Sequence, residues 1–177
     1  MRVVAALTTI PGGRAWGRCA LVYGVFLACA LPIGVLTGLL RPGTPQMTVA
    51  EMLGAGAMVF VHPAFVEELV FRVLLLPRDP SSLVRGRLVL VAGASLVLYV
   101  ASHPLNAMLF KPDLLPVFAS PAYLAIVVLL GLASTAAYWI SRSIWPPVVM
   151  HWVTVVAWLW LLGGQALLEH TARACVC

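Results

Sequence analysis

The sequence predicts an all-α, polytopic membrane helical bundle of about five transmembrane helices with its amino terminus in the cytoplasm. Of the 177 residues, 62% are hydrophobic and 10% are charged, against roughly 45–50% and about 25% in an average soluble domain. The 11 Lys and Arg and 6 Asp and Glu residues are too few to cover the surface of a water-soluble domain of this length. The same hydrophobicity excludes intrinsic disorder.

Five apolar stretches approach the roughly 20 residues that a membrane span needs. None shows sustained alternation of apolar and polar residues, so helices are expected rather than strands of a barrel. The expected spans are Cys19–Leu40, about Met52 to Pro77, Leu88 towards His103 and Pro104, Ala122–Ile140, and Val148 to about Leu168. They divide the chain into a short cytoplasmic segment (1–18), one transmembrane domain (19–170) and a short tail (171–177).

The positive charges in the connections predict the orientation of these spans. One side carries seven of them: Arg2, Arg14, Arg18, Arg78, Arg85, Arg87 and Arg142. The other side carries three: Arg41, Lys111 and Arg173. Cytoplasmic loops are enriched in Lys and Arg, so we expect the seven to face the cytoplasm and the carboxyl terminus to lie outside. The net charge of +5 is then explained by the basic residues that set the orientation of the spans in the membrane. No nucleic-acid partner is expected.

Three charged residues interrupt the second span, namely Glu67, Glu68 and Arg72. Ionisable groups at membrane depth are costly, so each one is a functional hypothesis. Glu68 and Arg72 are four residues apart and can pair on one helical face. Glu67, about 100° away around the helix, has no such partner. A buried carboxyl group beside a second carboxylate can accept a proton from water near neutral pH, as a general base must.

Two histidines in later spans complete the polar set. His103 directly precedes Pro104, a position biased away from helical geometry, so we expect the helix to end or kink there. Tyr99 and Asn106 would lie within hydrogen-bonding reach of His103. His151 lies about one turn after a Pro-Pro pair that opens the last helix, near the free N–H groups of the helix start.

Other ionisable or reactive side chains are interpreted as background. His62 should lie on a different helical face from Glu67. The four cysteines (Cys19, Cys29, Cys175 and Cys177) form no CxxC pair and are expected to be free thiols. The terminal Cys-Val-Cys lacks the C-a-a-X arrangement, so lipidation is not expected. A Pro-Gly-Gly run at residues 11–13 argues against a cleaved signal peptide.

Three short motifs resemble those of the CPBP intramembrane endopeptidases, also called the type II CAAX prenyl endopeptidase or ABI family. Residues 67–72 (EELVFR) match EExxxR, and residues 99–103 (YVASH) resemble FxxxH with Tyr in place of Phe. Residues 151–155 (HWVTV) resemble HxxxN, but Val155 stands where the family has Asn. The resemblance covers about residues 50 to 160.

The resemblance implies a role for each residue of the polar set. Glu67 would activate the attacking water, with Glu68 and Arg72 beside it. His103 would position that water and His151 would stabilise the oxyanion. Because Val155 cannot donate a hydrogen bond, Thr154 or Asn106 would substitute, or the oxyanion site would be built differently.

The family has been described both as glutamate-dependent and as metal-dependent. Glu67, His103 and His151 could form a zinc site, but we favour a metal-free glutamic mechanism without a cofactor. Counted along the helices, Glu67 would lie about 15 Å from Pro77 and His151 about 8 Å from Pro146. Both distances predict a site in the cytoplasmic half of the membrane, whereas His103, about 24 Å from Arg87, would lie deeper.

The resemblance implies an endopeptidase in a bacterial inner (plasma) membrane that cleaves a membrane-associated protein or peptide. Its substrate would be a prenylated CAAX-like tail or a C-terminal membrane-anchoring sorting signal, as in the myxosortase-like group. One alternative is a non-enzymatic scaffold or bacteriocin self-immunity protein of the same fold, which Val155 favours. Another is a proton- or metal-coupled transporter that uses Glu67, His103 and His151 as a relay, although no inverted repeat is visible.

Overall fold

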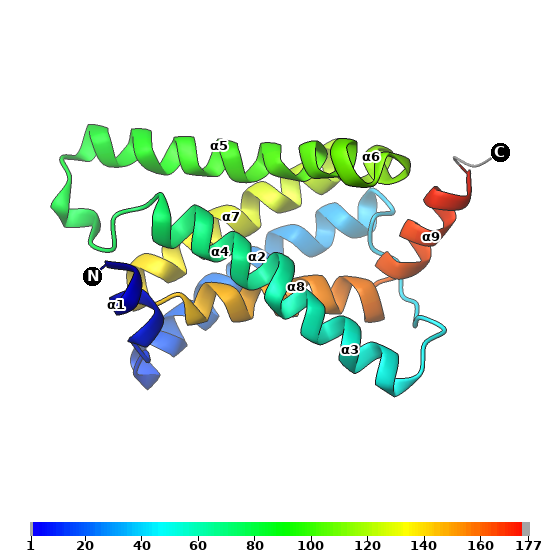
Figure 1. The fold of residues 1–177 in the computed structure, drawn as a ribbon, viewed down its shortest axis with the longest axis horizontal. Helices are drawn as coiled ribbons and strands as arrows, with labels where there is room; N and C mark the ends of the chain where they lie inside the picture. The colour runs from blue at the N-terminus through cyan, green and yellow to red at the C-terminus, as the bar shows by residue number, and fades with distance from the viewer. Residues whose placement is uncertain (1, 175–177) are drawn as a thin grey trace.

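The computed structural model describes residues 2–174, and the regular elements of this part of the chain are helices (Figure 1). This confirms the predicted all-α class. In chain order they are α1 (Arg2–Thr8), α2 (Gly13–Leu36), α3 (Val49–Val59), η1 (Phe60–Phe65), α4 (Val66–Glu68), η2 (Leu69–Leu74), η3 (Pro80–Ser82), α5 (Arg85–Phe110), η4 (Pro112–Leu114), α6 (Leu115–Phe118), α7 (Pro121–Ser141), α8 (Trp145–Leu161) and α9 (Gly164–Ala174). The terminal Cys-Val-Cys sequence lies outside the described residues.

Four helical stretches are long and apolar enough to cross a membrane, so the chain is an integral membrane protein. They are Gly13–Leu36, Val49–Leu74, Arg85–Phe110 and Pro121–Ser141. The fifth expected span was drawn too long, because α8 has 17 residues and ends at Leu161. Gly163 then adopts a φ of 73°, and a Cβ atom there would lie 2.6 Å from the carbonyl oxygen of Arg41. This glycine lets the chain turn sharply into α9.

The third span differs from the prediction at its proline. Helix α5 continues through His103 and Pro104 as far as Phe110, so the helix does not end at His103, which was one of the two outcomes expected there. Proline is tolerated inside membrane helices when other groups satisfy the affected backbone. Here Nδ1 of His103 adds a hydrogen bond of 2.9 Å to the carbonyl oxygen of Tyr99, in the turn that the proline weakens.

The second span is the irregular one, and it carries the acidic pair. It begins with a capping box, in which Thr48 and Glu51 exchange hydrogen bonds at the start of α3. At His62 the backbone leaves helical geometry (φ −138°, ψ 118°) before Pro63. Wider π-helical turns, η1 and η2, then flank the short α4. Such turns are frequent at functional sites.

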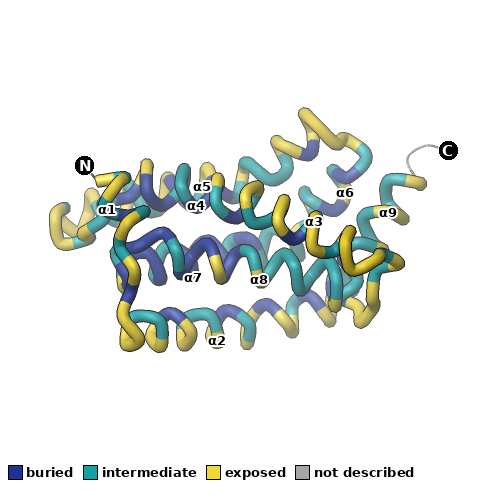
Figure 2. The backbone as a smooth tube through the Cα atoms, turned by 60° about the horizontal axis from the view of Figure 1, so that its bottom comes forward, coloured by how far each residue is buried: buried dark blue, intermediate teal, exposed yellow. Residues whose placement is uncertain are grey.

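Helix α7 lies at the centre of the bundle, in contact with α2, α5 and α8. It is more deeply buried than the other long helices, while α2, α3 and α5 keep exposed faces (Figure 2). One buried cluster packs around Tyr138 and Ile144, near the end that holds α1. A second packs α2 against α7 through Cys19, Phe26 and their neighbours. The exposed apolar faces of α2, α3 and α5 are therefore the surfaces available to lipid.

Candidate functional site

The fold brings the five polar side chains of the predicted set together in the interior. Glu67, Glu68 and Arg72 come from the second span, His103 from α5 and His151 from α8. Glu68, Arg72 and His151 are at most 2% exposed. Buried charge is costly unless it is paired and hydrogen-bonded, so the partners of each side chain decide what it can do.

Glu68 is the most fully occupied member of the cluster. Its Oε2 lies 3.1 Å from Nε of Arg72, which is the ion pair expected from their spacing. Its Oε1 accepts hydrogen bonds from Nδ1 of His151 at 2.9 Å and from Oγ of Ser134 at 3.3 Å. This carboxylate therefore joins α4, η2, α7 and α8.

Arg72 is held by groups from two further helices. Its Nη2 donates a hydrogen bond of 3.1 Å to the carbonyl oxygen of Gly131 in α7. Its guanidinium carbon lies 4.2 Å from the centre of the Tyr99 ring in α5, a favourable cation–π arrangement. The same ring packs edge-on against both His103 and His151. Tyr99 is fully buried and connects the ion pair to the two imidazoles.

Both histidines donate through Nδ1 and present Nε2 to Glu67. Nδ1 of His103 faces the Tyr99 carbonyl, and Nδ1 of His151 faces the Glu68 carboxylate; both partners accept hydrogen bonds. The Nε2 atoms lie 3.9 Å (His103) and 4.0 Å (His151) from Oε2 of Glu67. This orientation leaves the reactive nitrogen of each ring directed towards one carboxylate oxygen.

Within the described part of the chain, Oε2 of each glutamate lacks a hydrogen-bond partner, but Oε2 of Glu68 forms the ion pair with Arg72, whereas Oε2 of Glu67 faces no permanently charged group at that distance. Glu67 is 8% exposed, and its Oε2 has no hydrogen-bond partner among residues 2–174. Leaving a buried acceptor without a donor costs about 1–3 kcal/mol. A group that retains such a cost points to a partner supplied from solution or by a ligand.

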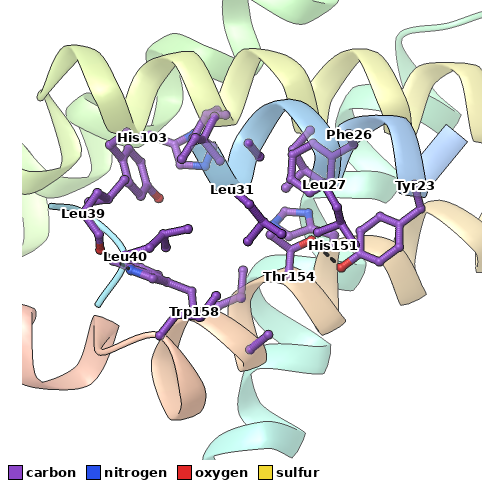
Figure 3. A pocket seen from close by; sticks show the side chains of 18 of the residues that line it. Tyr23, Phe26, Leu27, Leu31, Leu39, Leu40, His103, His151, Thr154 and Trp158 are labelled. Carbon is purple, nitrogen blue, oxygen red and sulfur yellow. Dashed lines mark hydrogen bonds between the residues drawn. The ribbon is translucent and has the colours of Figure 1, made fainter. Parts of the chain in front are cut away.

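Glu67 opens onto a cavity of about 500 Å³, which we call the Glu67 cavity. Its wall also includes His62, Asn106, Phe110, Lys111, Phe118, Leu159 and Leu168. A smaller, mainly apolar chamber of about 100 Å³ lies between α2, α7 and α8 (Figure 3). Five residues line both spaces: His103, His151, Tyr123, Val155 and Trp158. The histidines therefore lie where the Glu67 cavity and the smaller chamber meet.

The two suggested substitutes for the missing family Asn occupy different places. Oγ1 of Thr154 donates to the carbonyl oxygen of Met150 at 2.8 Å and lies 3.1 Å from the hydroxyl of Tyr23. Because its proton is used, Thr154 accepts from Tyr23 in the apolar chamber (Figure 3). Asn106 instead lines the Glu67 cavity. Of the two, Asn106 is the side chain with access to the cavity that holds Glu67.

Sequence reasoning missed three residues that line the Glu67 cavity: His62, Tyr123 and Trp158. The dismissal of His62 assumed a regular helix, and the backbone break at His62 removes that assumption. The following proline was the available signal, because a residue before proline avoids helical geometry. Tyr123 and Trp158 stand in uniformly apolar segments, where no pattern distinguishes them from packing residues.

The side chains of Glu67, His103 and His151 include donor types that zinc accepts. Both imidazoles also donate Nδ1–H to an outer acceptor, as metal-bound histidines commonly do. Among residues 2–174, however, no group of three or more His, Cys, Asp or Glu side chains lies close enough together to hold a metal ion. The donor types fit a metal, but their spacing does not.

A buried polar cluster that opens onto a cavity inside apolar helices identifies a functional site of a membrane protein. The family model described as "Type II CAAX prenyl endopeptidase Rce1-like" matches residues 48–157. The match covers more than half of the chain, which therefore belongs to this family of CAAX-type intramembrane endopeptidases. No curated protein and no solved structure matches the chain.

The arrangement predicts that Glu68→Gln destabilises the fold. The change would leave the buried Arg72 charge without its counter-ion, which typically costs about 3–5 kcal/mol. Thermal unfolding in detergent should show a clear fall in the transition temperature. The matched control is Glu169→Gln, which breaks an exposed pair with Arg173 and should change stability little. Equal unfolding temperatures for the two variants would contradict the role assigned to the buried pair.

Proposed function

We propose that the protein is a glutamate-dependent endopeptidase that hydrolyses a peptide bond of a membrane-associated protein or peptide. The observation that supports this most directly is the unpartnered Oε2 of Glu67, which faces two imidazole Nε2 atoms across the wall of a cavity. Family membership supports the protease activity, and the geometry supports the assignment of roles.

The spacing around Glu67 suits a bound water molecule. A water hydrogen-bonded at about 2.8 Å to each of two atoms holds them about 4 Å apart when the angle at the water is near 90°. The measured separations from Oε2 to the two Nε2 atoms are 3.9 and 4.0 Å. In a neutral imidazole that donates through Nδ1, Nε2 is an acceptor. Glu67 and His103 can therefore accept both water protons and leave an oxygen lone pair free to attack.

The hydrolytic step then follows from general base catalysis. Glu67 takes one proton from the water as the water oxygen bonds to the carbonyl carbon, and the carbonyl oxygen becomes an oxyanion. When the tetrahedral intermediate collapses, the carbon–nitrogen bond breaks. Glu67 returns the proton to the leaving nitrogen, so the carboxylate is regenerated. General acid–base catalysis of this kind contributes typically 10²- to 10⁴-fold to the rate.

His151 is placed to stabilise the oxyanion. Its Nδ1 donates to the Glu68 carboxylate, which orients the ring so that Nε2 lies 4.0 Å from the Glu67 carboxylate. In the protonated form of the ring, Nε2–H would donate to the developing negative charge.

We propose no step through a metal, because the spacing of Glu67, His103 and His151 does not provide a coordinating group. For location we propose the bacterial inner membrane. As substrates we consider a prenylated CAAX-like tail and a C-terminal membrane-anchoring sorting signal, both of which end in an apolar anchor.

Glu67→Gln should abolish cleavage without loss of the fold. The substitution removes the base but no hydrogen bond of Oε2 within residues 2–174. Cleavage of co-expressed membrane-anchored candidates should fall by about 10²-fold or more, while Glu169→Gln keeps wild-type cleavage. Cleavage that survives in Glu67→Gln would overturn the role of Glu67. A wild-type protein that cleaves none of the candidates would favour the scaffold or self-immunity alternative.

Removal of metals should leave cleavage intact. Purified protein treated with EDTA or 1,10-phenanthroline is expected to cleave its substrate at the untreated rate, because the proposed chemistry uses carboxylate and imidazole groups alone. Loss of activity that is restored by added zinc would instead make Glu67, His103 and His151 the metal ligands.

Val155→Asn should raise the rate of cleavage. Val155 lines both cavities beside His151, so an amide there could donate to the oxyanion. One oxyanion donor is worth about 10²–10³ in rate, and we expect an increase of up to about 10²-fold in kcat. Val153→Asn is the matched control, since Val153 is on the same helix and is 37% exposed. A rate no higher than wild type would show that the oxyanion site is already complete.

A further inference from the structure

The two ends of the helical bundle differ in how they are closed. The end that holds α1 is packed shut. Ala6, Val73, Leu76, Tyr138 and Ile144 are fully buried there in one cluster. No residue of α1 and none between 68 and 98 lines either cavity. The polar site therefore has a solid wall of side chains on this side.

Helix α1 is tied into that wall by hydrogen bonds. The carbonyl oxygens of Ala6 and Leu7 accept from the backbone N–H of Ile144 at 3.2 Å and from the indole N–H of Trp145 at 2.9 Å. Ser143 donates its hydroxyl to the carbonyl oxygen of Thr9 at 2.7 Å. These bonds fix the segment that leads into α8, six residues before His151.

A pair of arginines closes the same end. Arg78 and Arg142 donate to each other's carbonyl oxygens at 2.9 and 2.7 Å. Arg142 also lies 2.9 Å from Oδ1 of Asp79. Hydrogen bonds from Ser81 lower the pKa of Asp79 to about 2, so this carboxylate stays ionised. The connection between η2 and α5 is thereby fastened to the connection between α7 and α8.

At the opposite end the Glu67 cavity reaches the surface. Its wall continues from Glu67 past Asn106 to Phe110, which is 76% exposed, and to the exposed Lys111. Phe118 of α6 and Leu168 of α9 complete this rim. In Figure 1 this is the end where α6 and α9 lie, away from the labelled amino terminus. One route from Glu67 to the outside therefore runs to the end of the bundle that holds α6 and α9, and the exposed His62 of η1 borders the same cavity on the side of the bundle.

The charges assign the two ends to the two sides of the membrane. The sealed end holds seven arginines, and the open end holds Arg41, Lys111 and Arg173. Since cytoplasmic connections are enriched in Lys and Arg, the open end faces away from the cytoplasm. Counting along single helices placed Glu67 and His151 in the cytoplasmic half of the membrane, but it did not give the direction from which they are reached. That count ignored which end of the bundle is packed shut.

We infer that the substrate reaches Glu67 from the extracytoplasmic side of the membrane. This inference rests on the proposed function and narrows its substrate class. A prenylated tail is presented on the cytoplasmic side, where the bundle is sealed. The geometry fits a protein held by a C-terminal transmembrane anchor and cut where its chain enters the outer leaflet. The scissile segment would enter past Phe110 and Leu168.

Access can be measured without a known substrate. In a variant with all four cysteines replaced by alanine, Asn106→Cys and Glu67→Cys place single thiols on the cavity wall and at its base. Ser82→Cys, in η3 at the sealed end, is the matched control. A small membrane-impermeant thiosulfonate is applied to right-side-out and to inverted inner-membrane vesicles. We expect Asn106→Cys and Glu67→Cys to react at least 10-fold faster in right-side-out vesicles, and Ser82→Cys to react faster in inverted ones.

Three results would overturn the inference. Faster reaction of Glu67→Cys in inverted vesicles would place the opening on the cytoplasmic side. Reversed labelling of both Ser82→Cys and Asn106→Cys would show that the chain is inserted the other way. A Glu67→Cys thiol that reacts from neither side, while Asn106→Cys reacts from outside, would show that the cavity does not lead to Glu67. Since labelling does not depend on cleavage, these outcomes are independent of the Glu67→Gln activity test.

Discussion

The position of Glu68 between Arg72 and His151 is the constraint on which the rest of the site depends. One oxygen of this carboxylate faces the guanidinium at 3.1 Å and the other accepts from the imidazole at 2.9 Å. Breaking a buried pair is far more costly than breaking an exposed one, so the second span and α8 are held in one relative position. Because Nδ1 of His151 is committed to Glu68, its Nε2 can only face Glu67. The ion pair thus determines the surroundings of the Glu67 carboxylate through His151, without contacting Glu67 itself.

Two neighbouring glutamates consequently have different surroundings. Glu68 contacts Arg72, His151 and Ser134, whereas Oε2 of Glu67 has no hydrogen-bond partner among residues 2–174. Adjacent residues on a helix point about 100° apart, which allows one to face α7 and α8 while the other faces a cavity. The wider turns on both sides of α4 accommodate this arrangement within one span. The proposed base is thus the carboxylate outside the ion pair, and its neighbour is the one inside it.

Much of this architecture could be predicted from scarcity of charge. Against apolar spans, Glu67, Glu68 and Arg72 are conspicuous, and the i, i+4 spacing predicts the ion pair. The continuous α5 and the early end of α8 could not be predicted in this way. The first depends on a side-chain hydrogen bond from His103, and the second on a glycine turn packed against Arg41.

His62 was misjudged because helical periodicity holds only while the backbone is helical. The direction of access depends on packing between distant segments, such as α1 against the start of α8, which no local pattern reports.

The shortness of α8 has a consequence for the surrounding lipid. Its 17 residues extend only about 25 Å, less than the roughly 30 Å of the hydrocarbon layer. A short hydrophobic segment is accommodated by thinning of the bilayer, by flanking side chains that reach the interface or by association with other helices. Thinning where α8 turns into α9 would bring headgroups and water towards the cavity that Leu168 of α9 lines. It would shorten the path over which a polar peptide segment must leave water.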